Sequence, residues 1–344
     1  MRLLSISNID IELHWTFLIL IALVILLGGL SSALVAVILF SSVVIHELSH
    51  SYVAMLHGVK VKRIILLPIG GVSMIEEFAM PPQVELLVSI AGPLMSFALA
   101  LLAAGAGALT SDPALLAIAG TARDANLILG TFNLLPALPL DGGRVWRALR
   151  QRRRSYLQAT KEAVLLSKAA MALLLSTAFA AALLSGEIGF LFWNSIIALF
   201  VYLGADMEYD AALFKSASDG VRVRDVMRSE VVCASGGETL EEAFSLAKGA
   251  KVRNILLVGE RFGVVSLASF EKIPRREWGR RHIRSLSSHP LRAHPDDSVL
   301  EIWKWMRSAG VELAPVMDGS RLIGVVSETD IERIIYLNKI ALVA

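Results

Sequence analysis

Long apolar runs fill the first 206 residues of the chain and restrict it to folds that cross a lipid bilayer. A helix needs about 20 apolar residues to cross ~30 Å of hydrocarbon. Charged residues make up 19% of the chain, against about 25% in an ordinary soluble protein. The sequence therefore predicts an α-helical membrane protein with six transmembrane helices. These are residues 13–30, 33–56, 84–108, 121–140, 163–184 and 189–206.

Lysine and arginine residues predict which side of the membrane each connection faces, because cytoplasmic connections carry the excess of positive charge. The connections 28–33, 106–120 and 185–188 contain neither residue type. The connection 57–83 contains three such residues, and 141–162 contains seven. The second and fourth spans therefore end inside. The prediction is a multi-pass protein of the cell membrane with both termini and its C-terminal tail in the cytoplasm.

A His-Glu-x-x-His motif lies in the second apolar run. His46 and His50 are four residues apart, so a helix of ~3.6 residues per turn puts both imidazoles on one face. Glu47 is about 100° round the helix from His46, which places it poorly as a third ligand and well as the base for a metal-bound water. Ionisable residues in a membrane helix are costly and indicate function. A chance match of the short pattern is the alternative.

A third ligand is required, since catalytic zinc usually has three protein ligands and one open position. Asp141 is the candidate, because it follows Pro136 and Pro139 at the inner end of the fourth span, at about the depth of the histidines. The prolines unwind the helix, and the two glycines after Asp141 permit unusual backbone angles. The carboxylate can then turn inward. The alternative is that Asp141 only ends a helix in an Asp-Gly-Gly turn.

Residues 59–74, between the second and third spans, predict a small β-hairpin at the cytoplasmic rim. An apolar run from Val61 to Leu67 leads into Pro68-Ile69-Gly70-Gly71, which is a turn signal. One interpretation is an edge strand that pairs with an extended peptide. The other is a plain connecting loop.

The tail contains an internal repeat, because residues 263–269 match residues 324–330, 61 positions later. Each unit is predicted as helix, strand, strand, helix, and two such units can stack into one soluble α/β domain. The predicted organisation follows from this repeat. It comprises a membrane domain at residues 1–208, a linker at 209–220 and a tandem domain at 221–344, with repeats at about 221–275 and 281–338.

The His-Glu-x-x-His motif and the segment 133–144, with its Leu-Asp-Gly-Gly run, together resemble the site-2 protease family of intramembrane zinc metalloproteases. The resemblance covers about residues 10–150. It implies that His46, His50 and Asp141 bind one zinc ion and that Glu47 is the general base. It also implies a substrate helix that unwinds before its peptide bond is hydrolysed.

The same resemblance implies three further contacts with the substrate. Asn133 matches a family asparagine that contacts the substrate or the oxyanion. A polar residue in a span is equally suited to an interhelical hydrogen bond, so both interpretations of Asn133 stay open. Gly70 and Gly71 match the family's loop after the second span and are predicted to bind substrate.

The repeated tail resembles a pair of cystathionine-β-synthase-type (CBS) domains, which often bind adenine nucleotides. In that family a Ser/Thr-x-x-Asp turn after a strand places the aspartate on the ribose. Asp330 fits this pattern with Ser327, whereas the first repeat has Ser269 in the aspartate position. The resemblance implies an adenine nucleotide at Asp330 and Ser327. A purely structural tail and a homodimer through the CBS domains are further interpretations.

The expected function is an intramembrane zinc endopeptidase that cleaves membrane-anchored proteins in the bilayer, regulated by nucleotide at the tail. A non-catalytic membrane sensor of nucleotide or metal is disfavoured because a structural metal site needs no base such as Glu47. A zinc transporter is disfavoured because the spans show no chain of further ionisable ligands. No basic stripe with interleaved aromatics is present, so no nucleic-acid partner is expected.

Overall fold

The computed structural model of the protein divides into two units, Met1–Ala212 and Leu213–Ala344. The structure describes residues 2–6, 9–13, 15–59, 61–67, 70–75, 80–186, 188–229, 231–250, 252, 254–257, 263–287, 292–319 and 321–343.

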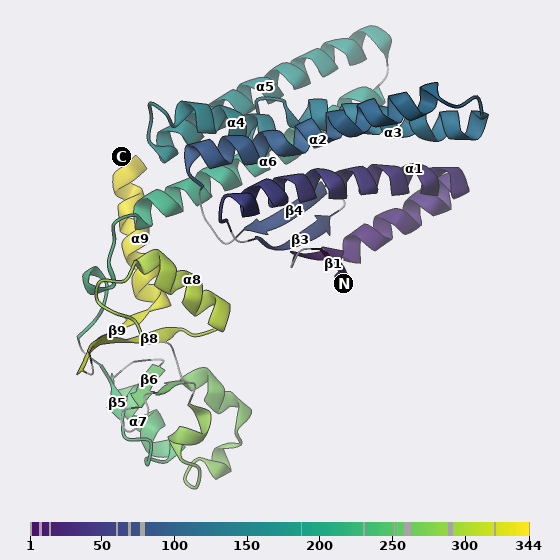
Figure 1. Ribbon diagram of the computed structural model, residues 1–344. Helices are drawn as coiled ribbons and strands as arrows, with labels where there is room; N and C mark the ends of the chain where they lie inside the picture. The colour runs from purple at the N-terminus through teal and green to yellow at the C-terminus, as the bar shows by residue number, and fades with distance from the viewer. Residues whose placement is uncertain are drawn as a thin grey trace. The chain divides into compact units, whose positions relative to one another are not determined.

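The first unit is mostly helical (Figure 1). Its first two predicted spans form one helix, α1 (Trp15–Leu56), interrupted at Gly29. Gly29 has φ 70° and ψ −164°, a conformation that glycine adopts without a steric penalty. This break falls where the sequence predicts the first connection, and it leaves a short helix before Gly29 and a long one after it.

The remaining helices of this unit begin and end at recognisable signals. α2 (Pro82–Ala108) and α3 (Pro113–Asn133) have proline in the first turn, and Asp112 caps α3 by accepting from the amides of Ala114 and Leu115. Ser155 and Gln158 form a capping box at the start of α5. Three further helices are α4 (Asp141–Arg150), α5 (Tyr156–Ser185) and α6 (Ile188–Ser218).

Four helical segments of the described chain are long and apolar enough to cross a membrane. They are Ser32–Leu56, Pro82–Ala108, Tyr156–Ser185 and Ile188–Ser218. The helix expected at 121–140 instead runs from Pro113 to Asn133 and holds the ion pair Arg123–Asp124 near its middle. It ends before Pro136 because proline lacks an amide donor and clashes with the preceding turn. The count of six spans therefore stays a prediction.

The predicted hairpin is confirmed, since β3 (Val61–Leu67) and β4 (Gly70–Ile75) pair antiparallel. Two N-terminal strands that the sequence did not predict, β1 (Arg2–Ile6) and β2 (Ile9–Leu13), extend it to a four-stranded sheet of order β1-β2-β3-β4. β2 and β3 run parallel. Strands β3 and β4 contact α1, the helix that carries the two histidines.

The second unit contains the two predicted repeats. The first comprises β5 (Cys233–Ala234), α7 (Leu240–Ala250), β6 (Asn254–Leu257) and β7 (Gly263–Ser266). The second comprises α8 (Val299–Ala309), β8 (Leu313–Asp318), β9 (Arg321–Ser327) and α9 (Glu328–Val343). Leu256 and Val264 of one repeat pack with Leu313 and Val325 of the other in a single buried cluster.

The two repeats differ at their last helix. The helix expected after β7 is the short 3-10 helix η2 (Leu267–Lys272) and not an α-helix. Pro274 stands two residues after the end of η2 and cannot continue a helical hydrogen-bond ladder. The corresponding α9 of the second repeat has no proline and runs for 16 residues.

Helix α6 continues through most of the segment that the sequence predicts as a linker, as far as Ser218. Its last turns belong to the second unit, where Ala217 and Phe214 pack in the core of the second repeat. The side-chain amide of Asn338 donates to the carbonyl of Ala217 at 2.9 Å. A single helix therefore joins the apolar unit to the repeats.

Candidate metal centre

Three side chains predicted as metal ligands lie together in the first unit. His46 and His50 are 2% and 8% exposed on α1, and Asp141 is 8% exposed at the start of α4. The Nε2 atoms of the two histidines are 3.1 Å apart. Asp141 Oδ2 lies 3.1 Å from His46 Nε2 and 3.2 Å from His50 Nε2.

These separations fit a single metal ion. Ligand atoms at ~2.0–2.1 Å from a tetrahedral zinc are separated from one another by about 3.3 Å. The three separations are close to that value, and two imidazole nitrogens with one carboxylate oxygen form a ligand set that zinc prefers. The chain can therefore hold zinc here with little movement of its side chains.

The outer nitrogens of both imidazoles are hydrogen-bonded, which orients the rings. His50 Nδ1 lies 2.6 Å from the carbonyl oxygen of Val88, which can only accept, so Nδ1 carries the proton. His46 Nδ1 lies 2.9 Å from the hydroxyl of Ser96, which is fully buried. When Nδ1 holds the proton, the Nε2 lone pair is free for a metal, as in most histidine-ligated sites.

Gly92 of α2 gives the imidazoles their space. A Cβ atom at this position would lie 2.2 Å from His50 Nε2 and 2.6 Å from His46 Nε2. Val88, Gly92 and Ser96 are spaced by four residues, so they lie on one face of α2. That face makes one hydrogen bond with each histidine, through the Val88 carbonyl and the Ser96 hydroxyl, and leaves space for the rings at Gly92.

The turn before Asp141 is fixed by close packing. The amide of Leu138 donates to the Ser167 hydroxyl of α5 at 2.7 Å, and the Leu138 side chain is fully buried. A Cβ on Gly142 would lie 2.2 Å from the carbonyl oxygen of Leu134, and a Cβ on Gly143 would lie 2.4 Å from the amide nitrogen of Leu138. The two glycines are thus needed because α4 begins directly against its own preceding turn.

The other residues predicted for the protease site lie at separate places. Glu47 is half-buried on α1 and interacts electrostatically with His50. Asn133 ends α3, and its side-chain amide donates to the carbonyl of Leu129 in the same helix at 3.0 Å. Gly70 and Gly71 begin β4, where they pair with Leu67 and Leu66.

The two residues predicted for nucleotide binding begin α9 in the second unit. Asp330 Oδ2 accepts from the Ser327 hydroxyl at 2.5 Å and from Arg228 Nε at 2.9 Å. Asp330 is 9% exposed. The Ser327 amide also donates to Asp330 Oδ2 at 3.3 Å, so in the structure this carboxylate caps α9 and pairs with Arg228.

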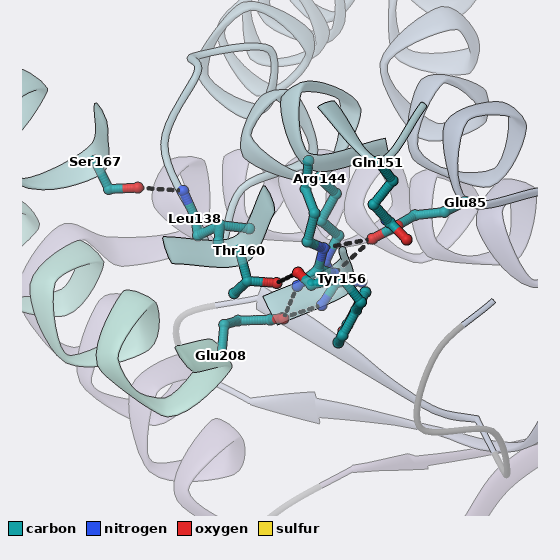
Figure 2. Close-up of polar contacts among 9 residues, drawn as sticks. Glu85, Leu138, Arg144, Gln151, Tyr156, Thr160, Ser167 and Glu208 are labelled. Atoms are coloured by element: carbon teal, nitrogen blue, oxygen red, sulfur yellow. Dashed lines mark hydrogen bonds and ion pairs between the residues drawn. The ribbon is translucent and has the colours of Figure 1, made fainter. Parts of the chain in front are cut away.

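Charged side chains beside the metal group were not predicted from the sequence. Glu85 of α2, Arg144 and Arg147 of α4, and Glu208 of α6 form a connected set of ion pairs (Figure 2). The carboxylate of Glu208 raises the pKa of Arg144. Burial acts to lower the pKa of Arg147, but Glu208 and Glu85 together raise it above its usual value. The signal in the sequence is only the presence of ionisable residues at the ends of apolar runs.

Known proteins place the chain in a family. A sequence profile of peptidase family M50 matches residues 34–125 and 113–177, and the CBS domain profile matches residues 223–271 and 282–336. The zinc metalloprotease MJ0392 of Methanocaldococcus jannaschii is 33% identical over 343 residues, which cover 96% of this chain and 95% of that relative. The solved site-2 protease from the same organism is 38% identical, with a TM-score of 0.47, over 61% of this chain and 94% of that one.

The two family profiles and the relative of 33% identity define the class, a membrane peptidase with a C-terminal pair of CBS domains. The chain belongs to peptidase family M50, the site-2 protease family. The resemblance inferred from the His-Glu-x-x-His and Leu-Asp-Gly-Gly motifs is confirmed, and so is the resemblance of the tail to CBS domains.

Because Gly92 lies directly against the two imidazoles, replacing it should disturb the metal site. Gly92→Ala is expected to weaken zinc binding by at least about tenfold, in the range found when groups around metal ligands are changed, because the added methyl occupies the space of the imidazole rings. Gly105→Ala on the same helix is the control, since no atom lies within 4 Å of its Cβ position. Zinc per chain, measured by atomic absorption after dialysis against a chelator, should fall for the first variant only. Equal zinc in both variants would contradict the geometry.

Proposed function

We propose that the protein is an intramembrane zinc endopeptidase that hydrolyses peptide bonds in or near the membrane spans of anchored proteins. The convergence of His46 Nε2, His50 Nε2 and Asp141 Oδ2 carries the proposal. Membership of a peptidase family supports it, as does a relative over nearly the whole chain that is named a zinc metalloprotease. One zinc ion per chain is proposed.

The proposed mechanism follows from the residues beside that site. When bound, zinc supplies Lewis acidity, which polarises the substrate carbonyl and makes a water acidic near neutral pH. Glu47 takes a proton from the water that attacks the amide carbon. It then delivers this proton to the leaving nitrogen as the carbon–nitrogen bond breaks. His46, His50 and Asp141 hold the centre, and Ser96 and the Val88 carbonyl keep the histidine rings oriented.

A transmembrane substrate must unwind to be cut, because the amides and carbonyls of an intact helix are hydrogen-bonded and unavailable. We propose that β4, an edge of the described sheet, pairs with the unwound segment through its backbone. Gly70 and Gly71 would then contact substrate at the start of that edge. Asn133 is proposed to contact the substrate carbonyl, in exchange for its bond to Leu129.

The sensor and transporter alternatives make different demands on the site. A structural metal site needs no base, yet Glu47 stands beside the ligands in sequence and in space. A transport path needs a succession of metal-binding groups, whereas the described residues form one such group, His46, His50 and Asp141. Both observations favour the peptidase.

Glu47→Gln tests the assignment of roles. This variant should lose cleavage of a co-expressed single-span substrate by at least ~100-fold, the lower end of the effect of a general acid–base, while retaining zinc. His46→Ala and Asp141→Ala should lose both cleavage and zinc. Metal analysis of purified variants and immunoblots of the substrate measure the two properties. Loss of zinc from the glutamine variant would overturn the role given to Glu47.

The proposed orientation places both termini, the tail and the arginine-rich segment after α4 in the cytoplasm, with six spans in all. It rests on the distribution of lysine and arginine among the connections. With Cys233 replaced, Arg152→Cys should resist an impermeant thiol reagent added to intact cells and react after the membrane is opened. Ser111→Cys, in the exposed connection between α2 and α3, should react from outside. The reverse pattern would invert the topology.

We propose that the CBS domains bind an adenine nucleotide, with Asp330 accepting from the ribose hydroxyls and Ser327 beside it. Asp330→Ala should weaken binding by about 10- to 150-fold, the effect of losing a hydrogen bond to a charged group. Ser269→Ala, at the matching position of the first repeat, is the control and should bind as the parent does. Titration calorimetry of the full chain with ATP, ADP and AMP measures this. If none binds below millimolar concentration, the tail is instead a structural or dimerisation module.

A further inference from the structure

The charged set formed by Glu85, Arg144, Arg147 and Glu208 links three helices, α2, α4 and α6 (Figure 2). Arg147 Nε donates to Glu85 Oε1 of α2 at 2.7 Å, and a terminal nitrogen of the same guanidinium donates to Glu208 Oε2 of α6 at 2.7 Å. Arg144 donates to the other oxygen of Glu208 at 2.8 Å. Gln151 donates to Glu85 Oε2 at 2.7 Å. The set contains two cations and two anions, so its net charge is zero.

Arg147 is the central member and the one most removed from water. Its side chain is 6% exposed, that of Glu85 is 8% exposed and that of Glu208 is 20% exposed. Its guanidinium also lies 5.2 Å from the centre of the Tyr156 ring. Replacing a buried ion pair with apolar groups is often neutral or stabilising, so such a pair is weak support for stability. The more informative effect of this ion pair is that it fixes the positions of the helices it joins.

Helix α2 connects this set to the histidines. Glu85 stands three residues before Val88 and seven before Gly92, so it lies on the face of α2 that orients the two imidazoles. Asp141 is the first residue of α4, and Arg147 lies on the same ten-residue helix. The Glu85–Arg147 pair therefore fixes the helix that carries the carboxylate to the helix that positions the histidines.

We propose that Arg147 is a positioning residue for the metal site, which sets the depth and rotation of α4 so that the Asp141 carboxylate faces His46 and His50. Glu85 and Glu208 are its two anchors. Functional side chains must be held within about 0.5 Å of their working geometry, and a helix of only ten residues needs such external anchors. The inference rests on the proposed zinc-dependent function and deepens it.

The ion pairs between Glu208 of α6 and the arginines of α4 link the metal site to a helix that extends into the second unit. Glu208 lies four residues before Ala212, where the first unit ends, and α6 itself continues to Ser218. A shift or rotation of α6 would act on both arginines of α4 through Glu208. Through these ion pairs, a movement of α6 would shift α4 and with it Asp141.

The test measures zinc affinity directly, by competition with a chromophoric chelator on the purified full chain. Arg147→Met and Glu208→Gln should each weaken zinc binding, by about 10- to 100-fold for Arg147→Met, as is typical when a group supporting a ligand is lost. Lys168→Gln is the matched control. Lys168 pairs with Asp206 between α5 and α6 at 2.9 Å, outside α4, so its loss should leave zinc affinity unchanged.

Two further measurements separate positioning from a general loss of structure. Saturating zinc should restore the kcat of Arg147→Met toward that of the parent with KM unchanged, and Arg147→Lys should have intermediate affinity because it keeps the charge with fewer donors. If Arg147→Met fails to fold, the neutral pair Glu85→Gln with Arg147→Met takes its place. Parent-like zinc affinity in a folded Arg147→Met or in this double variant overturns the inference. Equal zinc binding by the parent chain and Asp141→Ala would instead overturn the proposed zinc site.

Discussion

The packing of α2 against α1 at Gly92 is the contact on which the metal group depends. Two imidazoles one turn apart can face a common point only if the neighbouring helix leaves space for them, and Gly92 is the residue that leaves it. The same face of α2 supplies the Val88 carbonyl and the Ser96 hydroxyl, which are hydrogen-bonded to the Nδ1 atoms of His50 and His46. A larger residue at this one position would separate the helices or displace the ligands.

Polar groups buried among apolar helices are costly unless each has a partner. In the described part of the site this requirement determines the arrangement. The histidines are hydrogen-bonded on their outer side, the Leu138 amide donates to Ser167, and Arg144 and Arg147 of α4 are paired with carboxylates on α2 and α6. These contacts join α1 to α2, α4 to α2 and α6, and the turn before α4 to α5, so satisfying the polar groups also fixes the relative positions of these elements. The proposed chemistry at Glu47 then uses a geometry that the fold already requires.

The sequence predicted best those site residues that are recognised by their spacing along the chain. The four-residue interval between His46 and His50, and the prolines and glycines around Asp141, are local patterns, and they predicted a group that the structure brings together. The roles of Ser96, Gly92 and Arg147 depend on which helix faces which, and a serine, a glycine or an arginine in its own segment gives no sign of that. The N-terminal strands were missed because they are short, and because β2, which β1 pairs with, is held in the sheet by β3, some 50 residues later. The predicted bounds of the fourth helix and of the helix after β7 differ from the structure because prolines start or stop these helices: Pro113 lies in the first turn of α3, Pro136 follows its end, and Pro274 follows η2.

The central claim is that two histidines and one aspartate of this chain hold zinc. Zinc K-edge X-ray absorption of the purified protein tests it most directly, since it reports ligand types and distances without a substrate. The account predicts two imidazole nitrogens at about 2.0–2.1 Å and oxygen ligands at about 2.0–2.2 Å. A sulfur ligand at about 2.3 Å, or a spectrum without two imidazoles, would contradict it.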